Sequence, residues 1–220
     1  ELHLQEENGI WSGSLTGSAK IFSEELKSSF SLVFDPKNSL RLDQISLRSP
    51  IGNADGSMTL FANRNIDGSL KVSMQNLHAI APSWPLYGKG DLALRWSIGD
   101  EGQLFEADVK AEDLFYGTLQ AKNAFLYADI SKSGSTIYGE LQNIQDQSLL
   151  LETLSIEAES FDGVNWPARL LAEGDWKGPF FVTSHGTCVY EKPNLAIDLQ
   201  DLAGTLFFQP ITLTSPARLE

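Results

Sequence analysis

The sequence predicts an all-β protein folded as an elongated, curved, mainly antiparallel sheet, a taco-like trough with an apolar interior. Three observations predict this fold. Apolar and polar residues alternate with a period of two along most of the chain, as in strands with one buried and one wet face. Short turn sequences separate the alternating runs. No convincing helical pattern lies between these runs.

The alternation is clearest between Asp91 and Leu141. The apolar members of its first run are Leu92, Leu94, Trp96 and Ile98. After a turn at Gly99–Gly102, the same pattern returns with Phe105, Ala107, Val109 and Ala111. Many such runs in succession indicate one long sheet with an apolar face and a polar face.

The expected strands follow one another closely along the whole chain. They are Ile10–Gly17, Ala19–Ser23, Ser28–Phe34, Leu40–Ser49, Ser57–Ala62, Leu70–Gln75, Asp91–Ile98, Phe105–Ala111, Thr118–Asn123, Phe125–Ser131, Thr136–Gln142, Ser148–Leu151, Leu154–Ser160, Arg169–Lys177, Phe180–His185, Leu195–Leu199, Gly204–Gln209 and Thr212–Ser215. At the usual strand spacing, about eighteen strands make a sheet roughly 85 Å long. A flat open sheet of that size is uncommon, so we expect it to curl, fold over or split.

Turn sequences mark the connections between these strands. Gly, Pro, Asn and Asp cluster at Asp35–Asn38 and at Asn53–Gly56, and Asp67-Gly68 between alternating runs predicts a hairpin turn. The longest interval without strand character is Asn76–Lys89, which we expect to hold a turn of helix near Leu77–Ala81. We therefore expect an N-terminal β section over residues 1–80 and a C-terminal section, continuous with it, over residues 81–220.

The composition bounds the function. The chain has 220 residues, 42% of them hydrophobic, and a net charge of −13 from 29 acidic and 16 basic residues. This charge argues against binding to nucleic acid and against electrostatic docking on anionic lipids. Cys188 is the single cysteine, so no disulfide forms within the chain. No apolar run approaches the roughly 18 residues of a membrane span, and no signal peptide is evident. Because the chain starts and stops within strand-like sequence, we expect an internal fragment of a longer protein.

The sequence offers no convincing catalytic or metal-binding constellation. His185 and Cys188 are three residues apart, but a zinc site needs three or four ligands. Acidic pairs such as Glu112-Asp113 fall at strand ends, where solvated carboxylates are usual, and so they argue only weakly for a glycosidase. We expect no enzyme activity, no cofactor and no metal.

Four segments together resemble the AsmA-like superfamily, most closely the TamB family of inner-membrane subunits of the translocation and assembly module. They are Leu42–Leu60 (LDQISLRSPIGNADGSMTL), Asn76–Ile98 (NLHAIAPSWPLYGKGDLALRWSI), Ala107–Ile130 (ADVKAEDLFYGTLQAKNAFLYADI) and Asn194–Leu219 (NLAIDLQDLAGTLFFQPITLTSPARL). The second is similar to the family's L-x-x-x-A-P turn followed by G-x-x-x-L-x-L. The order and spacing of the four segments carry the resemblance.

The resemblance implies a lipid-transfer bridge. In that family, strands stack along a long axis into a trough that crosses the periplasm, and phospholipid moves along its apolar interior between the inner and outer membranes. The full-length protein is anchored in the inner membrane and supports outer-membrane biogenesis. An outer-membrane β-barrel, TamA, is the usual partner. An excised section of such a sheet also has two free edge strands, so we expect edge-to-edge self-association.

The apolar face is the expected path of the acyl chains. Its expected lining residues are Leu92, Leu94, Trp96, Ile98, Phe105, Val109, Leu126, Ile130, Ile137, Leu141, Ile156, Leu170, Trp176, Leu195, Ile197, Leu206 and Phe208. The alternative is a closed β-sandwich or β-stalk, a structural or binding module in which the same residues form a core without lipid.

Overall fold

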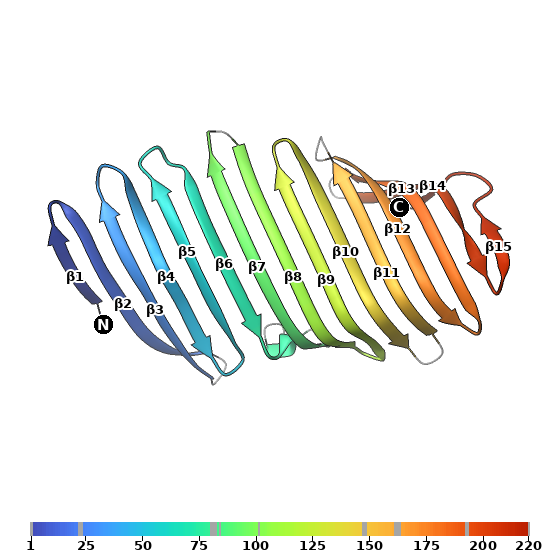
Figure 1. The fold of residues 1–220 in the computed structure, drawn as a ribbon, viewed down its shortest axis with the longest axis horizontal. Helices are drawn as coiled ribbons and strands as arrows, with labels where there is room; N and C mark the ends of the chain where they lie inside the picture. Colours follow the sequence, from blue (N-terminus) through green and yellow to red (C-terminus); the bar gives the residue numbers. More distant parts are fainter. Residues whose placement is uncertain are drawn as a thin grey trace.

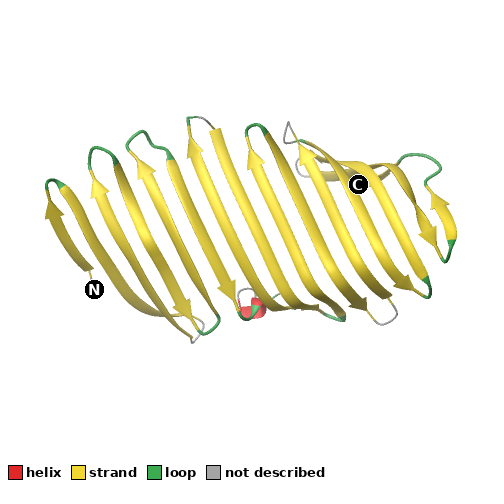
Figure 2. Ribbon diagram, viewed as in Figure 1, coloured by secondary structure: helices red, strands yellow, loops and turns green. Residues whose placement is uncertain are grey.

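The computed structural model describes residues 2–21, 24–79, 83, 85–100, 102–146, 149–160, 164–191 and 194–219. In this part of the chain, sixteen strands form a single antiparallel sheet, and one 3-10 helix lies in a connection between two of them (Figures 1 and 2). The predicted fold class, a long, curved all-β sheet, is confirmed. The sheet stays open and does not close on itself.

The strands are long and the connections short. Their bounds are β1 Leu2–Glu7, β2 Ile10–Ile21, β3 Glu24–Asp35, β4 Ser39–Ser49, β5 Gly52–Phe61, β6 Ile66–Met74, β7 Leu86–Gly99, β8 Gly102–Tyr116, β9 Leu119–Ser131, β10 Gly134–Asp146, β11 Leu149–Ser160, β12 Asn165–Trp176, β13 Pro179–Glu191, β14 Asn194–Leu206, β15 Gln209–Thr212 and β16 Ala217–Leu219. From β1 to β15, each strand pairs with its neighbours in sequence, and β16 pairs with β14 beside β15.

The sheet continues across the interval where we expected the two sections to meet. Strand β6 pairs with β7 along Ile66–Met74 and Gly90–Ile98. The expected turn of helix is a 3-10 helix over Leu77–Ala79, and the last two residues of the predicted turn, 80 and 81, lie outside the described residues. Leu77 covers Gly90, because a Cβ on that glycine would lie 3.1 Å from a Leu77 methyl carbon.

Two of the predicted turns are wrong. Asp67-Gly68 lies inside β6, and the Asn53–Gly56 segment lies inside β5. Gly68 is not a turn residue. It leaves room for the Trp96 ring of the adjacent strand, because a Cβ on Gly68 would lie 2.2 Å from that ring. A glycine beneath a cross-strand aromatic ring lets that ring lie flat on the sheet. The Asp35–Asn38 turn is confirmed, with the amides of Lys37 and Asn38 bonded to Asp35.

Four pairs of predicted strands are single strands, among them Leu195–Leu199 and most of Gly204–Gln209, which together form β14. Two observed strands, β1 and β16, match no predicted strand, so the eighteen expected strands become sixteen. Ile10–Gly17 joins Ala19–Ser23 in β2, and Thr118–Asn123 joins Phe125–Ser131 in β9. Ser148–Leu151 likewise joins Leu154–Ser160 in β11. The expected ends at Ser23 and Ser148 lie outside the described residues.

In β9 and β11, the alternation changes phase at an extra residue within a continuous strand. Asp113, Lys122, Asn143 and Glu152 lie side by side on β8 to β11, and the register passes over all four. We call these four residues the bulge row. All four side chains are exposed, and Asp113 and Asn143 have φ of 51°. An extra residue shifts the alternation by one position, which is why the apolar pattern changes phase there.

The bulge row keeps the apolar residues beyond it on the same face as those before it. Strand β12 has no extra residue, so Ala172, Gly174 and Trp176 all lie on the same face of it. Leu151 pairs with Gly174 and therefore lies on that face too. The same line runs from Leu151 through its partners Ile144, Ala121 and Leu114. Ile144 is only 2% exposed, so this line is well packed.

Substitutions at Asn143 test the bulge row. A β-branched residue at φ 51° meets its own backbone, so Asn143→Val is expected to lower the free energy of unfolding by about 1–2 kcal/mol. Asn143→Gly carries no such clash and is expected to be neutral or slightly stabilising. Urea unfolding of the two variants measures the difference. Equal midpoints for both variants would contradict the left-handed conformation at this position.

Candidate functional site

One face of the sheet carries a continuous line of residues without polar side chains. Residues directly opposite each other on antiparallel strands share a face, so the register shows which side chains lie together. We call this side the apolar face and the opposite side the polar face. From β7 to β12, the central line of the apolar face runs through Leu92, Val109, Leu126, Gly139, Ile156 and Leu170.

Nearly all the other predicted lining residues with described side chains lie on the same face. They are Leu94, Trp96, Ile98, Phe105, Ile130, Ile137, Leu141, Trp176 and Leu206. The side chains of Leu195 and Ile197 lie outside the described ones. Phe208 is different, because β14 ends at Leu206 and Phe208 lies in the turn that follows. The expected strand Gly204–Gln209 therefore ends earlier than predicted.

The apolar face is uncovered in the part of the chain that the structure describes. Leu126, Ile156 and Trp176 are 42%, 41% and 44% exposed, whereas core residues of a closed fold are almost fully buried. A closed β-sandwich needs a second layer over this face, and the described strands form one layer. An apolar strip of this length is unusual on a soluble surface and indicates a binding face.

A shallow cavity of about 410 Å³ lies in the middle of the apolar face. Gly139 makes room for it, because a Cβ there would lie 3.3 Å from Ile156 and 3.7 Å from Leu126. The apolar residues around it include Val109, Leu126, Leu141, Leu154, Ile156 and Leu170. The cavity can therefore hold a hydrocarbon group and gives a neutral hydrogen-bonding ligand little to contact.

The apolar face extends further than the predicted lining. The line through Leu92 continues toward the N-terminus through Val72, Ala54 and Leu47. The residues missed by sequence reasoning include Leu42, Leu47, Met58, Leu70, Val72, Leu114, Ile144, Leu151 and Leu154. Among the N-terminal members, Met58, Leu70 and Val72 follow a strict alternation and are open to prediction. Leu42 and Leu47 lie on either side of a register shift in β4. Those beyond the bulge row are out of phase with the central line.

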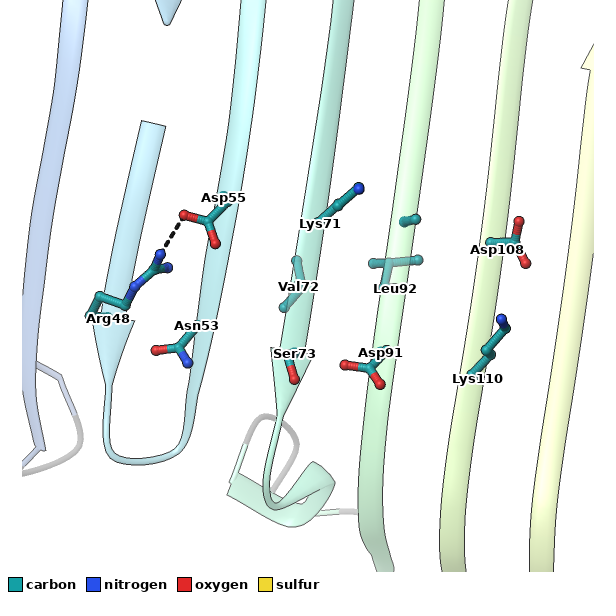
Figure 3. A pocket seen from close by; sticks show the side chains of 11 residues that line it. Arg48, Asn53, Asp55, Lys71, Val72, Ser73, Asp91, Leu92, Asp108 and Lys110 are labelled. Carbon is teal, nitrogen blue, oxygen red and sulfur yellow. Dashed lines mark hydrogen bonds and ion pairs between the residues drawn. The ribbon is translucent and has the colours of Figure 1, made fainter. Parts of the chain in front are cut away.

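The polar face also has a cavity, and charged and hydrogen-bonding side chains line it. A cavity of about 610 Å³ spans β4 to β8 (Figure 3). Arg48 donates to the Asp55 carboxylate at 2.5 Å, and this bond lowers the pKa of Asp55. Lys71, Asp91 and Lys110 follow across the next strands, so charges of both signs alternate. Such a mixed surface suits contact with water better than contact with a polyanion.

His185 and Cys188 lie on opposite faces, since they are three apart on an unbulged strand. The His185 ring bonds to Asp201 at 3.0 Å, which lowers the pKa of that carboxyl. Among the described residues, no three His, Cys, Asp or Glu side chains gather as a metal site requires.

No protein-family model, curated protein or solved structure matches this chain. Within its described residues, no helix has the length and apolar character needed to span a membrane.

Replacing Arg48 tests the electrostatics of the polar face. Arg48→Gln is expected to raise the pKa of Asp55 toward the usual aspartate value, because the guanidinium bond causes the present lowering. NMR titration of the carboxyl carbons measures it. Asp35 is the control, because its pKa is lowered by the Lys37 amide and the Asn38 side chain and should not change.

The direction of the shift also sets the sign of its pH dependence. The folded-state pKa of Asp55 is lowered, so its contribution to stability is present above the unfolded pKa and is lost as pH falls through the folded value. An unchanged Asp55 titration in Arg48→Gln would mean that the ion pair does not form in solution.

Proposed function

We propose that this chain is a section of a lipid-transfer bridge, in which the acyl chains of phospholipids lie along the apolar face. The observation that carries the proposal is the continuity of that face. Its apolar lines cross strand after strand, and large side chains in them stay more than a third exposed. A face of this kind is stable in water only when something apolar covers it.

The expected binding energy is moderate. Covering apolar surface stabilises by about 25 cal/mol per Å². Acyl tails that cover roughly 200 Å² are therefore held by about 5 kcal/mol before the cost of ordering the tail is subtracted. This is enough to keep lipid on the face and too little to hold it permanently.

The repetition of the face favours sliding over trapping. Beside the central line, a parallel line contains the small residues Ala107, Ala128, Ala158 and Ala168 together with Ile137. Successive strands thus offer similar apolar contacts. A lipid that moves by one strand loses the contacts of one strand and gains similar contacts on the next. No described residue on the central line from Leu92 to Leu170 bears a charge that would stop an acyl chain.

The wider setting of the proposal rests on the resemblance of the sequence to the TamB family. In that setting, the full-length protein is anchored in the inner membrane, crosses the periplasm and meets an outer-membrane β-barrel of the TamA kind. It carries phospholipid between the two membranes and supports outer-membrane biogenesis. We also propose edge-to-edge self-association. Strand β1 is an edge strand of the described sheet: β2 pairs with one of its edges, and no described strand pairs with the other.

Photo-crosslinking tests the lipid path directly. p-Benzoylphenylalanine in place of Leu94 or Val109 is expected to form phospholipid adducts, because both positions lie on the apolar face. The matched controls are the next residues, Arg95 and Lys110, whose side chains point to the polar face. Mass spectrometry of the adducts is the measurement. Equal lipid yields at test and control positions would reject the proposed path.

A charge placed in the central cavity tests the same path by binding. Leu126→Asp puts a carboxylate among the cavity side chains, so affinity for a fluorescent phospholipid is expected to fall roughly tenfold or more. Tyr127→Asp introduces the same charge on the opposite face and should leave the affinity nearly unchanged. Circular dichroism checks that both variants fold. The proposal fails if the two folded variants bind lipid equally.

A further inference from the structure

The turn between β14 and β15 has unusual chemistry. Leu206 pairs with Gln209, so the loop consists of Phe207 and Phe208 alone. Their φ angles are 50° and 62°. Two residues with positive φ between paired strands form the type I′ hairpin turn, which strongly prefers Asn-Gly. Phenylalanine is poorly suited to this conformation because its Cβ meets the backbone.

The same chain uses the favoured residues in an equivalent turn. Glu7 pairs with Ile10, and the two residues between them are Asn8 and Gly9, with φ of 56° and 80°. The Phe207-Phe208 turn therefore departs from the residues that local stability favours. Unfavourable backbone conformations that persist in a fold point to a function for the residues that adopt them.

The two phenylalanines of the turn differ in their surroundings: Phe207 packs against neighbouring residues, and Phe208 is exposed to solvent. The Phe207 ring lies 6.3 Å from the Trp176 ring and rests over Gly178, where a Cβ would lie 2.8 Å from it. The Phe207 amide also donates to the Pro179 carbonyl at 3.2 Å. In contrast, Phe208 is 80% exposed, the highest value among the exposed large hydrophobic residues described. The turn therefore presents one aromatic side chain on a fixed base.

A lysine completes this corner of the molecule. The Lys177 ammonium lies 5.9 Å from the Trp176 ring centroid. The nearby Asp175 carboxylate accepts a hydrogen bond from the Gly178 amide, which partly satisfies it. Aromatic rings beside a lysine form the combination found where proteins meet the lipid headgroup region, since the rings enter the hydrocarbon boundary and the ammonium stays in water.

We propose that the Phe207-Phe208 corner is a membrane-contact site that inserts Phe208 into the surface of a zwitterionic bilayer. One protruding side chain is far smaller than the roughly 800 Å² per partner of a stable protein interface, whereas shallow insertion needs only a few apolar groups. The net charge of −13 disfavours anionic headgroups. Trp176 and Leu206, on the apolar face, adjoin this corner. The proposal goes beyond lipid binding in the trough, and each can hold without the other.

Sedimentation with phosphatidylcholine vesicles tests the contact, using three variants. Phe208→Gly removes the ring and suits the turn, so binding is expected to fall tenfold to hundredfold while the midpoint of urea unfolding rises. Phe208→Leu keeps an apolar side chain and should retain most of the binding. Phe61→Ser removes another exposed phenylalanine, 38% exposed and on the polar face, and should bind like the unaltered protein.

Opposite signs for stability and binding in Phe208→Gly separate a membrane-contact role from a merely structural one. Vesicle binding equal to that of the unaltered protein in Phe208→Gly would overturn the proposal. The absence of vesicle binding by the unaltered protein would also overturn the proposal, and would instead favour a protein partner as the ligand of the turn. A drop in unfolding midpoint for Phe208→Gly would overturn the argument from turn chemistry. Crosslinking at Val109 reports on the trough separately, so failure of the two proposals is distinguishable.

Discussion

The structure depends on one constraint, the register of backbone hydrogen bonds between neighbouring strands. Because side chains alternate between faces, a slip of one residue moves every apolar side chain of a strand to the wrong side. Described strands from β1 to β15 pair in sequence order, so the face of each strand is set by the one before it. A single uncompensated slip would divide the apolar face in two.

The bulge row shows how this constraint is met where strands change phase. Four neighbouring strands each contain one extra exposed polar residue. The strands on either side of these four, β7 and β12, lack the extra residue, so the register shifts by one where they pair with β8 and β11, between Tyr87 and Lys89 and between Leu151 and Thr153. Because the four extra residues lie side by side, the shifted segments remain in register with one another. The apolar face therefore continues past the row, with Ile144 as its best-buried member. In the proposed bridge, such continuity is what a sliding acyl chain requires.

Much of this architecture is open to prediction from the sequence because alternation is a local signal. It places Leu92, Val109 and Leu126 on one face without knowledge of their partners. It fails where a distant residue decides the outcome. Gly68 reads as a turn residue, and only the Trp96 ring on the adjacent strand explains its place within β6. Phe208 reads as the next apolar residue after Leu206, because a pair of phenylalanines gives no turn signal.

The central claim is that lipid covers the apolar face, and the most direct measurement is quantitative mass spectrometry of an organic extract of the purified, folded protein. The account predicts phospholipid in at least equimolar amount, since the described strands leave that face open. Folded protein that is free of lipid and does not take it up from vesicles would contradict the claim.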